Sequence, residues 1–363
     1  MINRNARLVA RREITERLGE KSFLVSTGIT LAIIILVVVI PPLLGLGGTD
    51  KYVVATDAQS RPIAERAVAL AKNFDAEVTI GDTEPDVRLV DGEIRSEKEP
   101  DDTLVGLLQT ANQALEPSTR PALEVVTAKP VDPDRDAKAG LAFFAILMLY
   151  GQLIAYGFIV ASGVVEEKAS RVIEVLLATI KPKDLLTGKV VGLGLLGFGQ
   201  LLGIALVGVG VAGATGVLDI DGQLLSAVGL ALVWFVLGYA FYASLYAVAG
   251  AMVPRQEELQ SSTTPLTMAI LVSFFAGFAV MEDPDGVVAH VCAFIPFTAP
   301  ITMPGRIALG EAPAWEIAAS VGVMLAATAL LIPLAARIYS AVVLRTGTAV
   351  KLREALRLAR SAN

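Results

Sequence analysis

Six long apolar blocks decide which folds this chain can form. Of its 363 residues, 54% are hydrophobic and only 18% are charged, whereas about 25% of the residues in an ordinary soluble domain are charged. A helix needs about 20 apolar residues to cross a bilayer, and each block approaches or exceeds that length. We therefore predict an integral membrane α-helical protein. Its six transmembrane helices are expected at residues 23–46, 139–164, 189–216, 224–252, 264–281 and 314–336.

A basic segment, residues 1–22, precedes the first block. Leu8, Ile14 and Leu18 can form a partly apolar face among its arginines, which predicts an amphipathic helix on the cytoplasmic membrane surface. A cleavable signal peptide is the alternative interpretation, but its apolar core would be only about 7–15 residues long. The block at 23–46 is longer and has no clear cleavage site, so we expect an uncleaved first membrane helix.

Residues 47–138 differ in kind from the membrane blocks, because they contain 19 Asp and Glu against 11 Lys and Arg. Their short apolar runs are separated by turn residues, as in soluble proteins. This pattern predicts a small α+β domain between membrane helices 1 and 2. Strands are expected at 52–55 and 77–80, a hairpin at 87–94, and helices at 62–72 and 103–115.

Basic residues gather on one side of the predicted membrane helices. This side holds segment 1–22, the connectors 165–188 and 254–260, and the tail 337–363. Since cytoplasmic loops are enriched in Lys and Arg, we expect both termini in the cytoplasm. The acidic α+β domain and the loop 282–313 are then extracytoplasmic.

The stretch from Val165 to Val190 is the longest charged segment between two apolar blocks. Apolar residues recur at steps of three and four from Val165 to Ile180, which predicts a helix that Pro182 ends. Two interpretations stay open. The segment is either a solvated connector between membrane helices or an elbow on which a soluble partner docks beneath the membrane.

Glycines recur at four-residue steps, at Gly188 and Gly192 and again at Gly199 and Gly203. Small residues at this spacing let helix backbones approach closely in a membrane. The pattern predicts helix packing, either within the chain or between two copies of it.

The outer loop 282–313 is unusually apolar and contains Pro296, Pro300 and Pro304 at steps of four. Prolines at this spacing disfavour a continuous spanning helix, while the apolar residues between them disfavour a solvated loop. A short re-entrant or interfacial hairpin satisfies both observations, provided that it is buried in protein or lines a cavity. Arg306 at its end could contact a lipid phosphate or cap a helix, and we favour structural anchoring over contact with a substrate.

The residues present exclude several chemistries. Cys292 is the one cysteine and His290 the one histidine, so a single chain forms neither a disulfide nor a histidine-based metal cluster or catalytic triad. We therefore expect no catalytic residue and no metal site. A P-loop is also missing, because Gly188-Lys189 is followed by valine rather than Ser or Thr. Any ATP hydrolysis would have to come from another chain.

Ionisable residues are nearly absent from the apolar blocks, which argues against a proton-coupled carrier. Sodium could still be held by the hydroxyls of residues 261–264 and the carbonyl that Pro265 frees. A polar start of a helix is the simpler interpretation of these residues.

Two motifs together resemble ABC-2 type transporter permeases, particularly the sodium-extrusion (NatB-like) branch. In the cytoplasmic segment of that family a Glu-rich start is followed by an arginine, a Glu-hydrophobic-Leu-Leu run and a Leu-Leu-x-Gly-Lys close. The matching positions are Glu166, Glu167, Lys168, Arg171, Glu174, Leu176, Leu177, Leu185, Leu186, Gly188 and Lys189. The outer loop is similar to a Pro-Phe-Thr-x-Pro and Met-Pro-x-Arg pattern of the same branch. It matches at Pro296, Phe297, Thr298, Pro300, Met303, Pro304 and Arg306.

The resemblance implies the permease half of an ABC exporter in the plasma (inner) membrane of a prokaryote. Two six-helix subunits, as a homodimer or a pair of different permeases, would sit on separate ATP-binding subunits that hold ATP and Mg²⁺. The chain itself would be neither an enzyme nor a binder of cofactors or nucleic acid. The implied substrate is Na⁺ or a drug- or lipid-like compound, and the 165–188 elbow would couple ATP hydrolysis to export.

Two other classes of protein stay open. One is a membrane sensor or assembly factor whose outer domain binds a ligand or partner without transport. It predicts no stable ATPase partner and a 165–188 segment that tolerates substitution. The other is a channel or secondary carrier that works alone, which predicts flux in liposomes containing only this chain.

Overall fold

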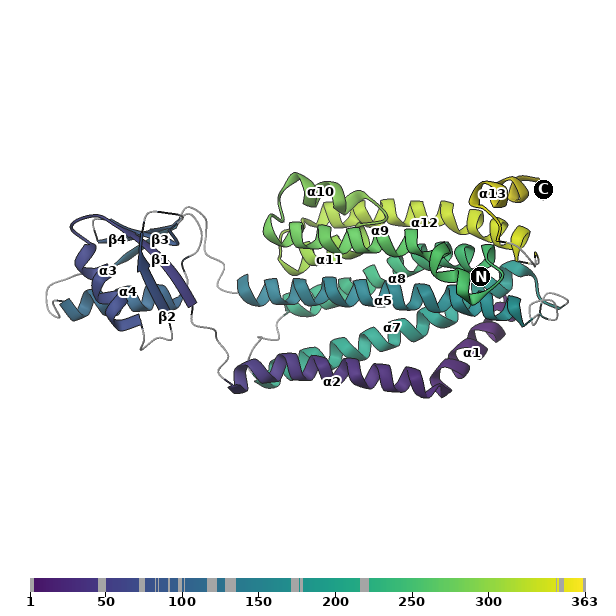
Figure 1. Cartoon of the computed structure of the whole chain (residues 1–363), viewed down its shortest axis with the longest axis horizontal. Coiled ribbons are helices and arrows are strands. Elements are labelled where there is room, and N and C mark those ends of the chain that lie inside the picture. Colours follow the sequence, from purple (N-terminus) through teal and green to yellow (C-terminus); the bar gives the residue numbers. More distant parts are fainter. Residues whose placement is uncertain are drawn as a thin grey trace. The chain divides into compact units, whose positions relative to one another are not determined.

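A computed structural model of the chain contains two compact units, Met1–Leu36 with Arg135–Asn363, and Val37–Asp134 (Figure 1). Each unit has its own hydrophobic core. The structure describes residues 3–44, 50–71, 76–81, 83, 85–90, 92–96, 100, 102–115, 123–127, 135–170, 176, 179–215, 222–343, 345 and 349–361.

The smaller unit is a mixed five-stranded sheet with two helices, in the strand order β2-β1-β3-β4-β5. β1 pairs in parallel with β2 and β3, β3 pairs antiparallel with β4, and β4 pairs in parallel with β5. Its core joins strand residues such as Val54 and Leu89 to Leu104 and Leu108 of a helix. In chain order the elements are β1 (Asp50–Thr56), α3 (Arg61–Leu70), β2 (Ala76–Ile80), β3 (Val87–Val90), β4 (Glu93–Ser96), α4 (Asp102–Leu115) and β5 (Glu124–Thr127).

The strands, helices and hairpin predicted for this segment are confirmed, whereas β5 was not predicted. The hairpin turn contains Gly92, whose φ of 79° lies in the left-handed region. Glycine adopts that conformation without the steric cost that a Cβ would add. The extracytoplasmic placement of this unit stays a prediction.

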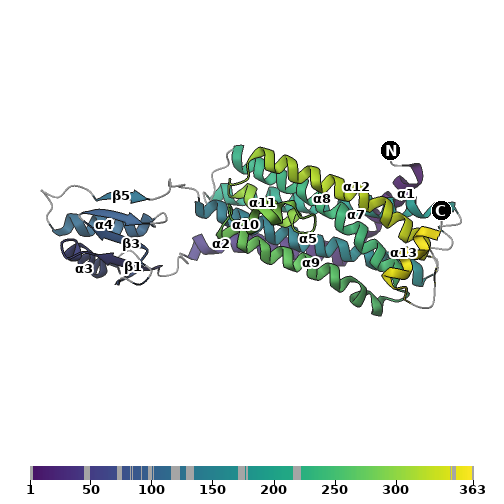
Figure 2. The ribbon, with the colours of Figure 1, turned by 90° about the horizontal axis from the view of Figure 1, so that it is seen from above.

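The larger unit is a bundle of long helices with shorter helices at both of its ends (Figures 1 and 2). α10 and α11 lie at one end of the bundle, while α13 and the N-terminus lie at the other. The helices are α1 (Arg4–Gly19), α2 (Lys21–Leu44), α5 (Arg135–Ala169), α7 (Pro182–Thr215), α8 (Gly222–Met252), α9 (Gln256–Glu282), α10 (Val287–Phe294), α11 (Ala299–Ala308), α12 (Ala314–Val342) and α13 (Leu352–Ser361).

Five of the helices in the described residues are long and apolar enough to cross a membrane. The helical membrane architecture is therefore confirmed. Within the described residues, α2 contributes a shorter apolar stretch, Lys21–Ile33, so a sixth crossing stays a prediction. The five spans are Lys138–Ala169, Pro182–Val211, Leu224–Met252, Gln256–Glu282 and Ala314–Val342.

α8 forms the centre of the bundle, where it contacts α5, α7, α9, α11 and α12. Its aromatic side chains fill the core, and Trp234, Tyr242 and Tyr246 are fully buried. Glycines on neighbouring helices make room for such rings. A Cβ at Gly157 of α5, for example, would lie 2.6 Å from the Tyr246 ring.

The helix boundaries near the charged segment differ from the prediction. α5 continues to Ala169, beyond the expected end at residue 164, and so carries residues 166–168 on its last turns. The predicted helix before Pro182 lies mostly outside the described residues, of which Leu176 and Thr179 are helical. Pro182 itself is the first residue of α7. The physical reason is that proline's missing N–H costs nothing in the first turn, where that group has no intrahelical partner.

Candidate functional site

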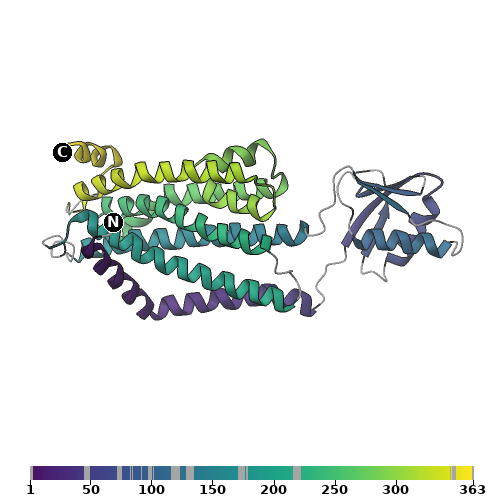
Figure 3. The same ribbon diagram turned by 180° about the vertical axis from the view of Figure 1, so that it is seen from behind.

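α1 packs against α7 through the first of the two glycine pairs (Figure 3). A Cβ at Gly188 would lie 2.5 Å from the Val9 Cβ, and one at Gly192 would lie 2.7 Å from the Ala10 carbonyl oxygen. These two glycines therefore form the surface of α7 on which α1 packs. Packing within the chain, one of the two predicted roles, is the one that the structure gives to this pair.

The second glycine pair has a different environment. Within the described residues no atom lies within 4 Å of a Cβ built at Gly199 or Gly203, apart from their own helix backbone and chain neighbours. The two pairs have the same sequence spacing but different surroundings. Helix α1 covers the first pair, whereas no other described helix packs closely on the second.

This difference gives a test. Gly192→Ala is expected to destabilise the protein by about 1–3 kcal/mol, because the new methyl group meets the α1 backbone and overpacks the contact. Gly210→Ala on the same helix is the control and should be neutral or slightly stabilising, since no atom of the described residues crowds a Cβ built there and alanine favours helix over glycine. Thermal unfolding of the purified protein in detergent compares the two. Equal destabilisation by the two substitutions would contradict the packing of α1 on Gly188 and Gly192.

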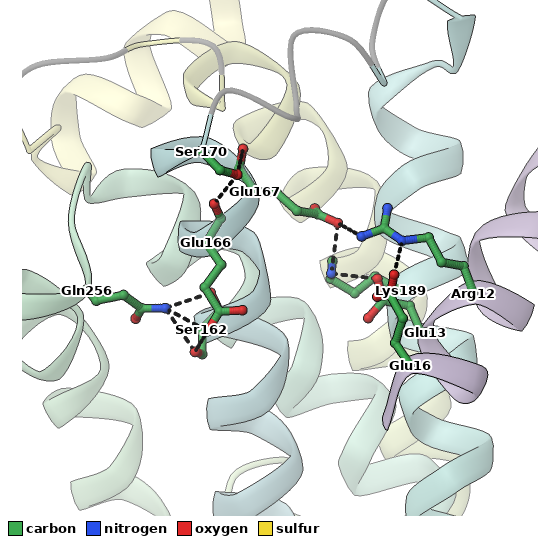
Figure 4. A network of polar contacts seen from close by, with 9 residues as sticks. All are labelled: Arg12, Glu13, Glu16, Ser162, Glu166, Glu167, Ser170, Lys189 and Gln256. Atoms are coloured by element: carbon green, nitrogen blue, oxygen red, sulfur yellow. Dashed lines mark hydrogen bonds and ion pairs between the residues drawn. The ribbon is translucent and has the colours of Figure 1, made fainter. Parts of the chain in front are cut away.

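Four charged side chains meet where α1, α5 and α7 converge, and we call them the charge network: Arg12, Glu13, Glu167 and Lys189 (Figure 4). Lys189 Nζ lies 2.7 Å from Glu13 Oε1 and 3.3 Å from Glu167 Oε1. Arg12 Nη2 lies 3.2 Å from the same Glu167 oxygen. The network thus joins three helices by ion pairs.

Burial makes the charge network sensitive to the loss of any member. The side chains of Lys189, Glu167 and Glu13 are only 3%, 6% and 7% exposed. Two positive and two negative charges offset one another, which buried ions require because desolvation of an unpaired ion is costly. Arg12 is partly exposed, and its hydrogen bond to Glu16, with the charge of Glu167, raises its pKa.

Lys168 is buried beside the network but contacts different helices. Its Nζ donates to the carbonyl of Ala251, 2.7 Å away, and to that of Val342, 3.5 Å away. These carbonyls belong to the last turns of α8 and α12. A cation is favourable there because the C-terminal end of a helix carries partial negative charge.

Glu166 is the exposed member of the Glu-Glu-Lys run. Its Oε1 accepts hydrogen bonds from Ser162 Oγ at 3.1 Å and from Gln256 Nε2 at 3.2 Å (Figure 4). The contact links the end of α5 to the start of α9.

The structure places several of the predicted coupling residues inside the helix bundle. Glu167, Lys168 and Lys189, which match the motif of the family's cytoplasmic segment, are buried and contact other helices of the same chain. Other helices of the chain bury these side chains, and the local sequence pattern does not reveal which helices pack there. Leu185 and Leu186 are buried, and Leu176 packs against the bundle core. Arg171, Glu174 and Leu177 lie outside the described residues.

Sequence reasoning did not include Arg12 and Glu13 among the site residues. The signal that could have identified them is the row of small residues on one face of α1. Ala6 and Ala10 are one helical turn apart, like the glycines they face, and both are buried. Glu13 follows on the same face and reaches Lys189.

The outer loop forms a helical hairpin, α10–turn–α11, whose second helix is almost wholly buried. The turn is held by its backbone, since the Phe297 carbonyl accepts hydrogen bonds from Tyr242 Oη at 2.6 Å and Ser273 Oγ at 2.9 Å. Thr298 Oγ1 donates to the Cys292 carbonyl at 2.6 Å. Pro300 packs on Gly238, where a Cβ would lie 2.6 Å from the proline.

Arg306 is fully buried and ties both ends of the hairpin together. It forms an ion pair with Glu316, which is also fully buried, at the start of α12. Its Nε donates to the Pro284 carbonyl at 2.8 Å, and its Nη2 to the Glu311 carbonyl at 3.1 Å. The suggested contact with a lipid phosphate is therefore wrong, because the guanidinium group faces inward. Met303 and Pro304 are buried beside it.

The hydroxyls considered for sodium donate to nearby backbone carbonyls. Thr263 and Thr264 bond to carbonyls of the preceding turn of α9, and Ser262 bonds to the Ala249 carbonyl at 2.9 Å. This arrangement is that of a polar helix start, the simpler of the two interpretations.

Comparison with known proteins gives a family. A model of the family described as ABC-2 family transporter protein matches residues 101–337. The uncharacterized protein YhaP of Bacillus subtilis (strain 168) is 32% identical over 237 residues, which are 61% of the chain and 56% of YhaP. The uncharacterized protein MJ1024 of Methanocaldococcus jannaschii is 26% identical over 183 residues, 50% of the chain and 44% of that protein. The chain spans about half the length of these curated relatives, and no solved structure matches it.

Proposed function

Because the family match covers well over half of its residues, the chain belongs to the ABC-2 family of transporter proteins, and we propose that it is the membrane permease subunit of an ATP-driven exporter. The observation that carries the coupling part of this proposal is the charge network. It joins α1, α5 and α7 beside the 165–188 segment, where a soluble partner would dock. ATP and Mg²⁺ would be held by a separate ATP-binding subunit.

The proposed coupling is mechanical. Exposed groups of the 165–188 segment, such as Glu166, Lys181 and Lys183, are available to a partner. Glu167 and Lys189 lie behind them and bind α5 and α7 to α1. A push on the segment would then move three helices as one body, since packed helices shift between discrete arrangements more readily than they deform. The charged residues here therefore form two groups. The exposed Glu166, Lys181 and Lys183 form a contact layer for a partner, and the buried Glu167 and Lys189 form a transmitting layer.

We propose that the end of the bundle with α1 and α13 is cytoplasmic. Exposed basic residues gather there, among them Arg4, Arg255 and Arg353, whereas Glu282 and Asp285 lie exposed near the α10–α11 end. Positive charge marks the cytoplasmic side of membrane proteins. The plasma membrane of a prokaryote is the proposed location.

We favour a drug- or lipid-like substrate over Na⁺, because the buried charged side chains already contact other groups of the chain. In the described part of the chain, each buried charged side chain is engaged by an ion pair or hydrogen bond to another group of the chain: Glu13, Glu167, Lys168, Asp184, Lys189, Arg306 and Glu316. A sodium ion would have to compete with these contacts. Sodium stays the alternative substrate suggested by the family resemblance.

A second permease subunit, identical or different, is also proposed. The open glycine pair Gly199 and Gly203 supports this pairing, because a helix from another copy can approach closely there.

Reversing two charges in the contact layer tests the coupling. The double variant Lys181→Glu with Lys183→Glu is expected to lower co-purification of an ATP-binding subunit at least fivefold, while the amount of inserted protein stays unchanged. Both side chains are exposed on this chain, so folding should tolerate the change. Affinity purification from the native host in mild detergent, followed by an ATPase assay, measures the effect.

Glu282→Lys, at the opposite end of the bundle, is the control and should retain the partner. Unchanged co-purification in the double variant would contradict docking at this segment. A chain that purifies alone and without ATPase activity would instead support the sensor or assembly-factor class, for which the separately folded unit Val37–Asp134 supplies a ligand-binding candidate.

A further inference from the structure

The C-terminal helix α13 has two sharply different faces. Ala355 and Ala359 are buried, and Leu356 and Leu358 pack against the bundle core. The opposite face is exposed and basic, with Lys351 just before the helix and Arg353, Arg357 and Arg360 within it. The apolar face is thus occupied by the protein's own helices, which leaves the basic face free.

The basic face has little internal charge compensation. Glu354 is the single acidic residue of α13, and it pairs with Arg345 at 3.3 Å. Among the residues that the structure describes, no ion pair engages Arg353, Arg357 or Arg360. Their guanidinium groups remain available to an external anion.

The position of α13 brings this face to the edge of the membrane-spanning helices. The backbone N–H of Val350, just before α13, donates to the carbonyl of Met252 at 2.8 Å. Met252 is the last residue of α8, and α12 ends at Val342 shortly before α13 begins. Figures 1 and 3 show α13 at the end of the bundle, beside the end of α12. The candidate spans in α8 and α12 end at Met252 and Val342, so α13 follows the membrane-spanning part of the chain, where lipid headgroups are expected.

We propose that the basic face of α13 binds the phosphate groups of anionic phospholipids and holds the C-terminal helix against the membrane surface. Clusters of four to eight Lys and Arg residues next to a membrane helix typically bind anionic lipid. The face carries guanidinium groups without the exposed aromatic anchors that protein interfaces concentrate at their centres. Lipid phosphates therefore match its chemistry better than a protein surface.

A fluorescence experiment on the full chain tests this. Cys292→Ser and Leu352→Cys give a single labelling site at the exposed start of α13. The labelled protein is placed in nanodiscs of phosphatidylcholine, with or without phosphatidylglycerol, that contain a headgroup nitroxide quencher. Quenching is expected to increase when phosphatidylglycerol is present. Each basic side chain contributes about fivefold to the binding constant, so the triple variant Arg353→Gln, Arg357→Gln and Arg360→Gln should abolish the increase.

The controls separate this site from general charge effects. Lysine at the same three positions should restore the lipid dependence, which also shows that the helix is folded. Glutamine at Arg4, Arg7 and Arg11, which removes equal charge from the exposed face of α1, should leave it unchanged. Equal quenching in both nanodiscs, equal loss in the α1 variant, or a response only when an ATP-binding subunit is added would overturn the proposal.

Discussion

Replacing Arg306 by alanine is expected to destabilise the protein by about 3–5 kcal/mol, the cost of leaving a buried charge without its partner. The change strands the fully buried carboxylate of Glu316 and removes the hydrogen bonds to the carbonyls of Pro284 and Glu311. The α10–α11 hairpin should loosen first, because Arg306 holds both of its ends. Thermal unfolding in detergent and hydrogen exchange over residues 287–308 measure the two effects.

Two comparisons make this prediction specific. Arg345→Ala removes an exposed pair with Glu354, whose side chains are 49% and 54% accessible, and should cost at most about 1 kcal/mol. The double variant Arg306→Met with Glu316→Leu should be less harmful than Arg306→Ala alone, because no charge is left unpaired. A single variant as mild as Arg345→Ala would contradict the anchoring role.

Lys189→Met is expected to have an effect of similar size, about 3–5 kcal/mol, through the charge network. Glu13 and Glu167 both lie within 3.3 Å of Lys189 Nζ. Without the ammonium group these two buried carboxylates repel each other, with only the partly exposed Arg12 near them. We therefore expect α1 to separate from α7, which appears as faster hydrogen exchange of the α1 backbone amides and a lower unfolding temperature.

Lys183→Met is the matched control, since it removes the same charge from the exposed surface of the same helix. It should leave both the exchange of α1 and the unfolding temperature unchanged. If Lys189→Met behaved in the same way, the network would not be what holds α1 on α7.

Hydrophobic patterning predicted the long helices well. The block at 224–252 coincides almost fully with α8, because an uncharged run of this length has few alternatives in a membrane. The hairpin at 87–94 was also predictable, since its turn contains Gly92 between two short runs of residues that favour β-strands. β5 was missed, because a strand of four residues near a Pro- and Asp-rich exit has too little pattern of its own.

Burial of charge was harder to predict than secondary structure. Glu167 lies in a charged run that is typical of a solvated surface, and its burial depends on α1, which is far away in the sequence. Arg306 is ten residues from Glu316, across a loop, so their pairing depends on how the hairpin folds back. By contrast, the spacing of Gly188 and Gly192 correctly indicated close helix packing, although not which helix would fill it.

Uptake into inside-out membrane vesicles tests the proposed exporter most directly. Vesicles would contain the chain together with the ATP-binding subunit purified with it, and both a fluorescent lipid-like compound and radioactive sodium would be offered. We expect ATP-dependent uptake of the lipid-like compound that requires both proteins and is lost in Lys181→Glu with Lys183→Glu. Uptake by the chain alone without ATP, or no uptake of either substrate, would contradict an ATP-driven permease.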